Sequence, residues 1–312
     1  MTLHFKTEEK RCPVCKAEKI EKQYFSSSEG VLSLPNINHS RCLGCGTVFV
    51  NPQPTPESLE AFYNSMESEE VESVLANSLQ RYRDPAKRDY FITHRVQPLL
   101  TYLSPAASIL DIGCGTGVFV RFMVDHGFDA FGIDIHKPSI EYGKKNLNLD
   151  DRLSTLIWDD LPDNKQYDMI TAWTVLEHLS EPEEFLKTCQ KLLKPGGILL
   201  TEFPTVDSLL FEKTEDGFFW VMPPYHLFLF SKKGAETLLK KADFTPLTYR
   251  NMPNNWYFSA SLARKLDVDI NSALQQTPEL QKLFSHIDRV FDEVALESSK
   301  SSTIYFISQK AS

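Results

Sequence analysis

The stretch ILDIGCGTGVFV, residues 109–120, places three glycines within five positions, directly after an apolar run that contains Asp111. An apolar run, a glycine-rich turn and a second apolar stretch are typical of a strand followed by a turn and a helix. In an open α/β sheet, the first turn of this kind forms the floor of the crevice at the carboxyl ends of the strands. The stretch therefore predicts a ligand site at this turn.

The spacing of the glycines excludes two common nucleotide sites. The turn reads Gly113-x-Gly115-x-Gly117 followed by Val118, whereas a dinucleotide fingerprint requires its third glycine at position 118. A Gly-Lys-Ser/Thr ending is missing, which excludes a nucleoside-triphosphate P-loop. The polar anchor of the ligand is therefore something other than a phosphate clamp.

From Ser108 to about Arg250, short apolar runs alternate with amphipathic stretches such as PEEFLKTCQKLL. This alternation predicts βαβ units and a parallel sheet, which STIYFISQ near the end of the chain completes as a last strand. Two insertions interrupt the pattern. Residues 204–230 are dense in aromatics and are expected to form a flap over the carboxyl end of the sheet. Residues 251–300 contain an amphipathic helix from Pro278, whose apolar face is expected to pack on the core.

The composition is that of a soluble globular protein, with 42% hydrophobic and 24% charged residues among 312. No apolar run approaches the ~18 residues of a membrane span, and the charged N-terminus lacks the apolar segment of a signal peptide. A cytoplasmic location is therefore expected. The formal charge of −9 argues against a nucleic-acid partner, because such affinity comes mostly from Lys and Arg.

Four of the six cysteines form two Cys-x-x-Cys pairs in the first 45 residues: Cys12 with Cys15, and Cys42 with Cys45. In a reducing compartment this pattern favours a structural zinc site of four thiolates, with disulfides or unligated thiols as the alternatives. We expect a small zinc-ribbon-like module over residues 1–52, a helical linker or lid over 53–104, and the α/β core over 105–312. The linker is expected to be interrupted near Asp84-Pro85.

The core, about residues 105–250, resembles class I S-adenosylmethionine-dependent methyltransferases. Besides the glycine turn, the resemblance depends on Asp134 at the end of FGIDI, on IWDDLP, and on YDMITAWTVLEHLSEPEEFLKTCQKLLKPGGILLTEFP. It implies a Rossmann-like fold with a mostly parallel seven-stranded sheet and S-adenosylmethionine as the methyl donor.

The resemblance also implies a role for each donor-site residue. Asp111 would meet the amino-acid end of the donor, Asp134 would accept both ribose hydroxyls, and Asp159 would approach the adenine amino group. The donor-binding residues expected on this basis are Asp111, Gly113, Cys114, Gly115, Gly117, Asp134, Ile135, Asp159, Asp160, Leu161, Ala172 and Trp173. Without a base partner in the sequence, Cys114 and Cys189 are read as packing residues.

Together with CPVC and RCLGCGTVFVNPQPTPESLEAFY, the core resembles bacterial sugar C-methyltransferases, which carry an N-terminal zinc-binding domain. That resemblance implies a nucleotide-linked sugar or a related small metabolite as the acceptor. The chain departs from this family by stopping soon after the expected last strand, where those enzymes continue into a further C-terminal domain.

Two histidines are the candidates for removing a proton from the acceptor. His226 matches a histidine of a Glu-His pair in the sugar C-methyltransferases, with Tyr225 at the position of that Glu. His178 follows Glu177, in a Glu-His pair widespread in the broader family. The alternatives are that His178 braces its loop and that His226 packs in the flap. Residues expected to wall the acceptor site, or else to pack, are Tyr63, Phe218, Phe219, Trp220 and Tyr225.

Two other functions remain open from the sequence. Some ribosomal RNA methyltransferases also place a zinc module before this core, and such a function predicts salt-sensitive RNA binding. The second alternative is a catalytically silent binding module, which need not bind the methyl donor.

Overall fold

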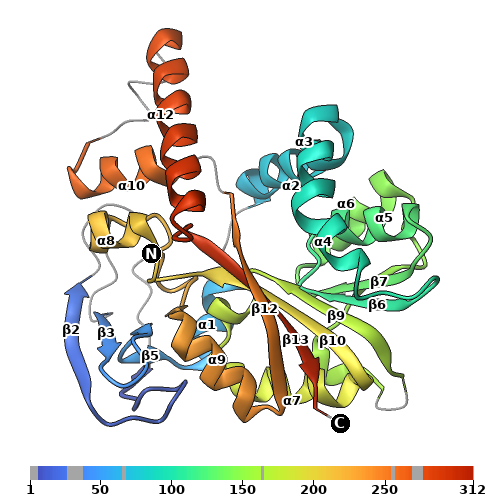
Figure 1. Cartoon of the computed structure of the whole chain (residues 1–312), viewed down its shortest axis with the longest axis horizontal. Helices are drawn as coiled ribbons and strands as arrows, with labels where there is room; N and C mark the ends of the chain where they lie inside the picture. The colour runs from blue at the N-terminus through green and yellow to red at the C-terminus, as the bar shows by residue number, and fades with distance from the viewer. Residues whose placement is uncertain are drawn as a thin grey trace.

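The computed structural model describes residues 6–26, 38–64, 68–162, 165–253, 257–268 and 277–311. Its centre is a seven-stranded sheet with helices on both faces (Figure 1). The strands, in their order across the sheet, are β12 (Phe244–Met252), β13 (Thr303–Lys310), β10 (Leu193–Pro204), β9 (Tyr167–Trp173), β6 (Ser108–Ile112), β7 (Asp129–Asp134) and β8 (Leu153–Thr155). Only β13 runs antiparallel to its neighbours, so the expectation of a mostly parallel seven-stranded sheet with a late last strand is confirmed.

Both faces of the sheet are buried, because successive side chains of a strand point to opposite faces. Ile109 packs with one apolar cluster and Leu110 with the other, and Met169 and Ile170 divide in the same way. Helices α5 (Val118–Asp125) and α6 (Lys137–Leu147) cover the first face, while α7 (Pro182–Leu192) and α9 (Lys232–Lys241) cover the second. The expected stripe of α7 is buried: Phe185, Leu186, Cys189 and Leu192 are each at most 2% exposed.

The N-terminal segment forms a second sheet that includes a strand of the core. The strands of this segment are β1 (Thr7–Glu8), β2 (Ile20–Ser26), β3 (Asn38–Cys42), β4 (Val48–Val50) and β5 (Gln53–Pro54). β1 and β5 pair only with each other, as a separate two-stranded sheet. β2, β3 and β4 pair in this order, and β11 (Phe228–Leu229) adds to the free edge of β4 by pairing Phe228 with Phe49. The cysteines Cys12, Cys42 and Cys45 belong to the same apolar cluster as α7 and α9. The N-terminal segment and the core therefore share one hydrophobic interior.

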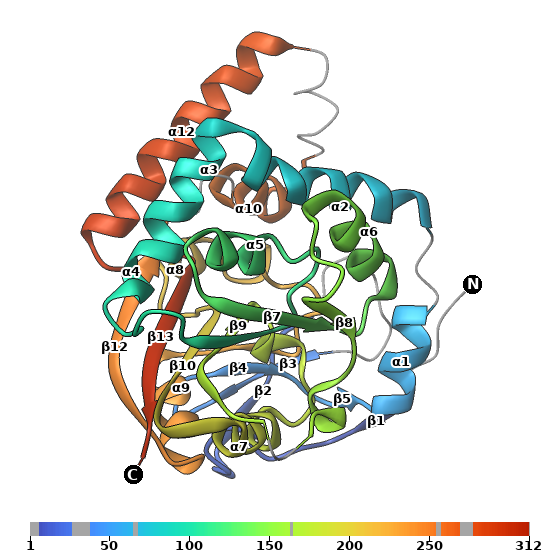
Figure 2. The ribbon, with the colours of Figure 1, turned by 90° about the vertical axis from the view of Figure 1, so that its right-hand side faces the viewer.

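The linker is helical and breaks where Asp84-Pro85 predicts. It comprises α1 (Pro56–Asn64), α2 (Ser68–Arg83), α3 (Pro85–Phe91), the π-helix η1 (Ile92–Val96) and α4 (Gln97–Leu100). Asp84 ends α2 and caps α3 by accepting a hydrogen bond from the Lys87 amide at 3.0 Å. Figure 2 shows α2 and α3 above α5 and α6, and the Ser78 and Thr116 hydroxyls, 2.8 Å apart, join α2 to the glycine turn.

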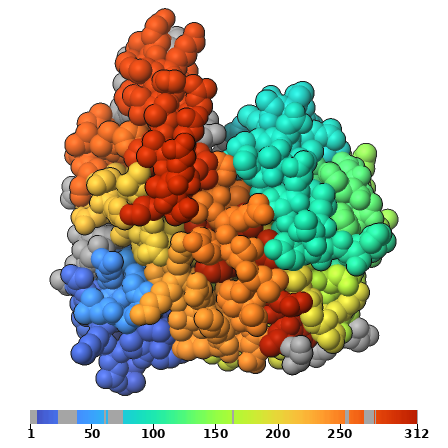
Figure 3. All heavy atoms as spheres, viewed as in Figure 1, coloured from blue at the N-terminus to red at the C-terminus, as the bar shows by residue number. Residues whose placement is uncertain are grey.

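The insertions contain α8 (Leu209–Thr214), α10 (Tyr257–Lys265) and α12 (Pro278–Glu297). In the second half of α12, Phe291 stacks on Phe258 at 4.4 Å and Ala295 is buried. Leu283 and Val294 are 52% and 49% exposed. The expectation that the whole apolar face packs on the core is therefore wrong, because α10 is nine residues long and α12 is 20. The helix extends beyond the body of the molecule, and the surface is hollowed between α12 and α3 (Figure 3).

Candidate functional site

The glycine turn between β6 and α5 adopts a backbone that favours glycine at all three positions, with φ of 72° at Gly113, 54° at Gly115 and 76° at Gly117. A Cβ atom at Gly113 would lie 2.6 Å from Val175 Cγ2. A Cβ atom at Gly115 would meet no atom within 4 Å, so the backbone of Gly115 faces open space. The outer glycines thus pack the turn closely, and the central one leaves room for a ligand to approach the main chain.

Asp134 closes one edge of this turn from the end of β7. Its Oδ2 accepts a hydrogen bond from the Gly115 amide at 2.8 Å, and its Oδ1 accepts one from the His136 amide at 2.8 Å. Each carboxylate oxygen has two acceptor positions, so both oxygens retain capacity for a ligand hydroxyl. The half-buried side chain is therefore both oriented by the backbone and able to accept further hydrogen bonds.

Asp111 lies beneath the turn and is 2% exposed. The Thr171 hydroxyl donates a hydrogen bond to its Oδ1 at 2.7 Å. Burial raises the pKa of Asp111 to about 7, and the nearby Asp134 carboxylate acts in the same direction, while the Thr171 hydrogen bond opposes both. A positive charge brought to the turn would favour the ionised form of this carboxyl group.

Beyond the turn, the edge of the sheet presents apolar side chains next to acids. Ile135 is 61% exposed directly after Asp134, and Ile157 is 42% exposed directly before the short 3₁₀ helix η2 (Trp158–Asp160), which carries the exposed Asp159 and Asp160. The exposed Ile157 was not among the expected site residues. Its signal in the sequence is its position as the first residue of IWDDLP, two residues after the end of β8.

The other expected donor-site residues lie deeper. Ala172 is buried at the end of β9, and Leu161 is partly buried against the core cluster around α7. Cys114 packs against β7, because a Cβ atom on Gly132 would lie 2.7 Å from its Sγ. Cys114 therefore packs against its neighbouring strand, and its expected part in donor binding stays a prediction.

Trp173, at the end of β9, contacts an ion pair that the sequence did not reveal. The Arg95 guanidinium lies 4.5 Å from the centre of the Trp173 ring and forms an ion pair with Glu202 at 2.5 Å. Arg95 comes from η1 and Glu202 from the end of β10, and the exposed fractions of their side chains are 19% and 2%. No local pattern signals this pair, because the two residues are far apart in the chain.

The structure brings three of the four catalytic candidates together beside the turn. Glu177 and His178 lie on the 3₁₀ helix η3 (Leu176–His178), which follows Val175, the residue packed on Gly113. His226 reaches them from the first insertion, residues 204–230, where the Leu227 amide donates a hydrogen bond to the Glu177 carbonyl at 2.7 Å. One side-chain nitrogen or oxygen atom from each of Glu177, His178 and His226 lies within 4.8 Å of the others.

Burial controls the charge of this cluster. Glu177 is 0% exposed, and neither of its carboxylate oxygens has a hydrogen-bond partner among the described residues, so burial raises its pKa. Burial lowers the pKa of His178 to about 4, although a hydrogen bond with the Tyr225 backbone acts to raise it. Burial also lowers the pKa of His226 to about 3, and the nearby His178 lowers it further. Both imidazoles are therefore neutral near pH 7 and have a nitrogen lone pair.

Aromatic side chains surround the histidines. Trp220 stacks on His226 with ring centres 5.4 Å apart and contacts Tyr257 at 4.8 Å, and Phe219 stacks on Tyr257 at 4.6 Å. The Tyr225 ring packs edge-on against Phe62 of α1 at 4.8 Å. Phe218 is fully buried and takes no part in this wall. The side chain of Tyr63 lies outside the described residues.

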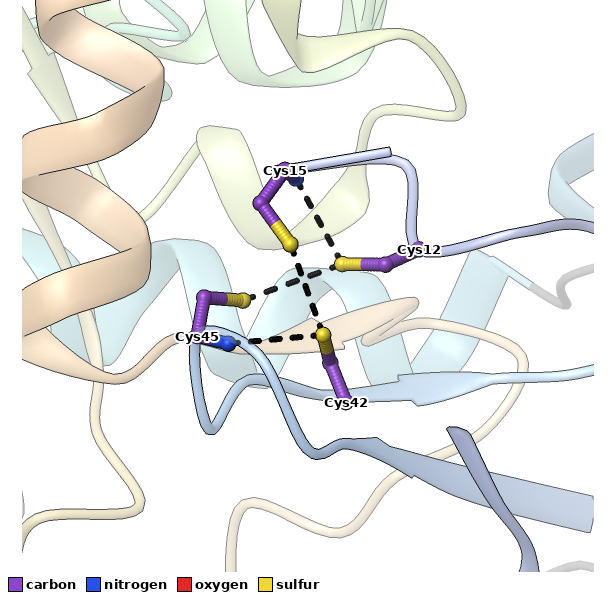
Figure 4. A group of neighbouring side chains, drawn as sticks. All are labelled: Cys12, Cys15, Cys42 and Cys45. Atoms are coloured by element: carbon purple, nitrogen blue, oxygen red, sulfur yellow. Dashed lines mark hydrogen bonds between the residues drawn. The ribbon is translucent and has the colours of Figure 1, made fainter. Parts of the chain in front are cut away.

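The four N-terminal cysteines converge as the spacing predicts (Figure 4). Cys12 Sγ lies 3.7 Å from Cys45 Sγ, and Cys15 Sγ lies 3.4 Å from Cys42 Sγ. Four thiolates around one Zn²⁺ at ~2.3 Å would be about 3.8 Å apart, so the residues fit this ion. All six cysteines are free thiols, so the disulfide alternative does not hold.

The backbone of both Cys-x-x-Cys pairs is shaped for this arrangement. The Cys15 amide donates to Cys12 Sγ at 3.5 Å, and the Cys45 amide donates to Cys42 Sγ at 3.4 Å. Lys16 has a φ of 61°, close to the 85° of Gly46 at the equivalent position, so a lysine occupies a conformation that favours glycine. The hydrogen bond with Cys45, together with burial, raises the pKa of Cys12. A bound cation would lower the pKa of Cys12 again, because metal ligation favours the thiolate.

Comparison with known proteins places the core in a family. The family described as "Methyltransferase domain" matches residues 82–249. The chain is 25% identical over 215 residues to a ubiquinone biosynthesis O-methyltransferase of Acinetobacter baylyi, covering 60% of this chain and 87% of that protein. It is 28% identical over 188 residues to a protein of the same name from Vibrio vulnificus, covering 54% and 73%.

A solved structure of an S-adenosylmethionine-dependent methyltransferase from Clostridium acetobutylicum is 10% identical, with a TM-score of 0.49 over 78% of this chain and all of that one. One from Archaeoglobus fulgidus is 18% identical, with a TM-score of 0.49 over 74% and 97%. The family match covers more than half of the chain, and it coincides with the glycine turn and the sheet order described above. The chain belongs to the class I S-adenosylmethionine-dependent methyltransferases.

Proposed function

We propose that this enzyme transfers the methyl group of S-adenosylmethionine to an oxygen atom of a small-molecule acceptor. The observation that carries the proposal is the position of the cluster of Glu177, His178 and His226 beside the glycine turn, to which Val175 joins it. Oxygen is the proposed acceptor atom because the similar proteins from A. baylyi and V. vulnificus are named O-methyltransferases.

The donor would lie along the carboxyl ends of β6 and β7. We assign its amino-acid end to the turn above Asp111, its ribose hydroxyls to Asp134, and its adenine to the acids of η2 and the exposed Ile135. The sulfonium supplies an activated methyl group. The chain's own contribution is to hold both reactants in line and to exclude water.

For a hydroxyl acceptor, a proton must leave as the new bond forms. In the proposed step the acceptor O–H gives its proton to a neutral imidazole of His178 or His226, and the oxygen attacks the methyl carbon. The carbon–sulfur bond breaks and its electron pair stays on sulfur, so the products are the methyl ether, S-adenosylhomocysteine and the proton held on imidazole. Trp220 and Tyr257 would wall this step from solvent.

For the acceptor we propose a nucleotide-linked sugar or a related small metabolite. The support is the resemblance of the N-terminal cysteine pairs and the following core to sugar C-methyltransferases. The four cysteines would hold a structural Zn²⁺, since four thiolates leave no open coordination position. Among the described residues, no helix is both long enough and apolar enough to cross a bilayer.

The test is a methyl-transfer screen. Purified protein and S-adenosylmethionine are incubated with nucleotide-linked sugars and with other hydroxylated metabolites, and both S-adenosylhomocysteine and the methylated product are measured by mass spectrometry. Turnover should require the acceptor and should fall in Asp134→Ala. Donor binding without turnover on any acceptor would favour the silent binding module, and salt-sensitive methylation of RNA would favour the RNA alternative.

A further inference from the structure

We propose that Glu177, His178 and His226 form a second metal site, which binds one divalent transition-metal ion at the acceptor side of the methyl-donor turn. This site is distinct from the four-cysteine site, which lies between the N-terminal sheet and α9. Its three side chains offer two imidazole nitrogens and one carboxylate, a set that suits zinc, manganese and iron(II).

The three ligand atoms are already gathered. One from each residue lies within 4.8 Å of the others, and the His178 and His226 rings meet edge to face with centres 4.8 Å apart. Imidazole nitrogens and a carboxylate oxygen at ~2.0–2.2 Å from one ion would be about 3–3.5 Å apart. Small side-chain rotations would therefore close the ligands on a cation without moving the backbone.

Glu177 supplies an independent reason to place a cation here. Its side chain is 0% exposed, and both carboxylate oxygens lack a hydrogen-bond partner in the described part of the chain. A buried carboxyl group without a partner is costly, and pairing with a metal ion is one of the few ways in which proteins compensate it. Among the described basic residues, no lysine or arginine forms an ion pair with it, whereas Glu202, the nearby acid, is paired with Arg95.

The surroundings of both histidines are those of metal ligands. His226 Nδ1 lies 2.9 Å from the Trp220 carbonyl, which can only accept a hydrogen bond, so Nδ1 carries the proton and Nε2 keeps its lone pair. The Tyr225 backbone also forms a hydrogen bond with His178. Ligating histidines commonly donate their other N–H to a backbone carbonyl, which fixes the tautomer and the orientation of the ring.

A cation held by these three residues would also have a role in methyl transfer. It would coordinate the acceptor hydroxyl and lower its pKa, so that the proton leaves to solvent and the oxygen is already oriented toward the donor. This consequence depends on the proposed function, but the metal site does not. In that case the imidazoles act as ligands, and the acceptor proton leaves to solvent instead of to an imidazole.

The test uses Co²⁺ as the probe, because its spectrum reports the ligands. The full chain is first loaded with one Zn²⁺ in the closed cysteine site and then titrated with Co²⁺. Wild-type protein should bind one Co²⁺ and develop weak d–d bands without the intense thiolate-to-cobalt charge-transfer band. Glu177→Gln, which keeps the shape of the side chain, and His178→Asn should each bind at least about tenfold more weakly.

Matched variants keep the result interpretable. Glu183→Gln changes a nearby partly exposed acid on α7 and should leave Co²⁺ binding unchanged. Near-ultraviolet circular dichroism checks that each variant is folded. The proposal fails if zinc-loaded wild type gives no d–d bands, or if Glu177→Gln binds Co²⁺ as tightly as wild type does. Both readouts are independent of methyl transfer, so failure of this site and failure of the proposed function are distinguishable.

Discussion

A single carboxylate, that of Asp134, joins the glycine turn to the expected ribose site. Its two oxygens hold the amides of Gly115 and His136, and this fixes their direction before any ligand arrives. An aspartate is required here because an asparagine has one acceptor oxygen and cannot accept from both amides and two ribose hydroxyls at once. The side chain therefore orients the local backbone, and in the proposed function it also binds the donor.

Asp134→Ala should weaken binding of S-adenosylmethionine by about 10–100-fold, since hydrogen bonds to a charged group contribute about 1.5–3 kcal/mol. Isothermal titration calorimetry measures the Kd. Asp150→Asn, at an exposed position after α6, is the control and should leave the Kd unchanged. An unaltered Kd in Asp134→Ala would remove the basis of the donor-site assignment.

Asp111 should give the stability of the protein a measurable pH dependence. Burial raises its pKa from 3.8 to about 7 in the folded state, so between these values the folded protein binds the additional proton. The contribution of Asp111 to stability is therefore fully present below pH ~4, decreases as the pH rises toward about 7, and is constant above it.

In Asp111→Asn this decrease should be absent, while the amide oxygen still accepts from Thr171. The free energy of unfolding of the variant, measured in urea, should rise relative to wild type between pH 5 and pH 8. Parallel curves for the two proteins over this range would mean that Asp111 does not titrate there.

At the scale of elements, α9 links the cysteines to the core. Its cap residue Ser231 donates a hydrogen bond to the Cys45 carbonyl, and Lys241 at its end donates one to the Val14 carbonyl at 2.9 Å. A Cβ atom on Gly234 would lie 2.1 Å from Thr47 Oγ1, so the helix starts in direct contact with the N-terminal sheet. Disturbing the cysteines should therefore affect the core as well.

Cys12→Ser should lose the bound zinc and lower the Tm by at least about 5 °C, which corresponds to roughly 3 kcal/mol for a chain of this size. Metal analysis and scanning calorimetry together make the measurement. Cys189→Ala, in α7, is the control: it removes a buried thiol and lowers the Tm, yet it should keep the zinc that binds at the cysteine site. A Cys12→Ser protein with full zinc content at that site would contradict the assignment.

At the scale of the whole molecule, the N-terminal segment and the methyltransferase core form one structure. β11 completes the N-terminal sheet, and Phe228 and Phe230 of the core are buried in the same cluster as Cys12 and Phe49. Removing the N-terminal segment would expose this apolar surface to water, at a cost of about 25 cal/mol per Å².

A chain consisting of residues 53–312 should accordingly aggregate or lose its cooperative unfolding transition. Size-exclusion chromatography and near-ultraviolet circular dichroism test this expectation. A chain that lacks only residues 1–5 is the control and should behave as the full chain does. A monomeric 53–312 fragment with the Tm of the full protein would show that the two parts fold independently.

The correct expectations concern features that short stretches of sequence encode. The glycines at 113, 115 and 117 predicted a turn because only glycine readily adopts their backbone angles. The four cysteines predicted that their side chains converge, because each Cys-x-x-Cys pair supplies two ligands to one metal ion. The expectation for α12 was wrong because helical periodicity reports an apolar face and not the length of its partner.

By itself, the sequence determined the order of strands and helices, the glycine turn, the acid at the end of β7 and the paired cysteines, because these depend on local backbone preferences and short spacings. Only the tertiary structure decided that His226 meets Glu177 and His178, that Arg95 pairs with Glu202 beside Trp173, and that β11 completes the N-terminal sheet. The physical reason is that partners and burial at these positions come from segments far apart in the chain, whose meeting is governed by the packing of the whole core.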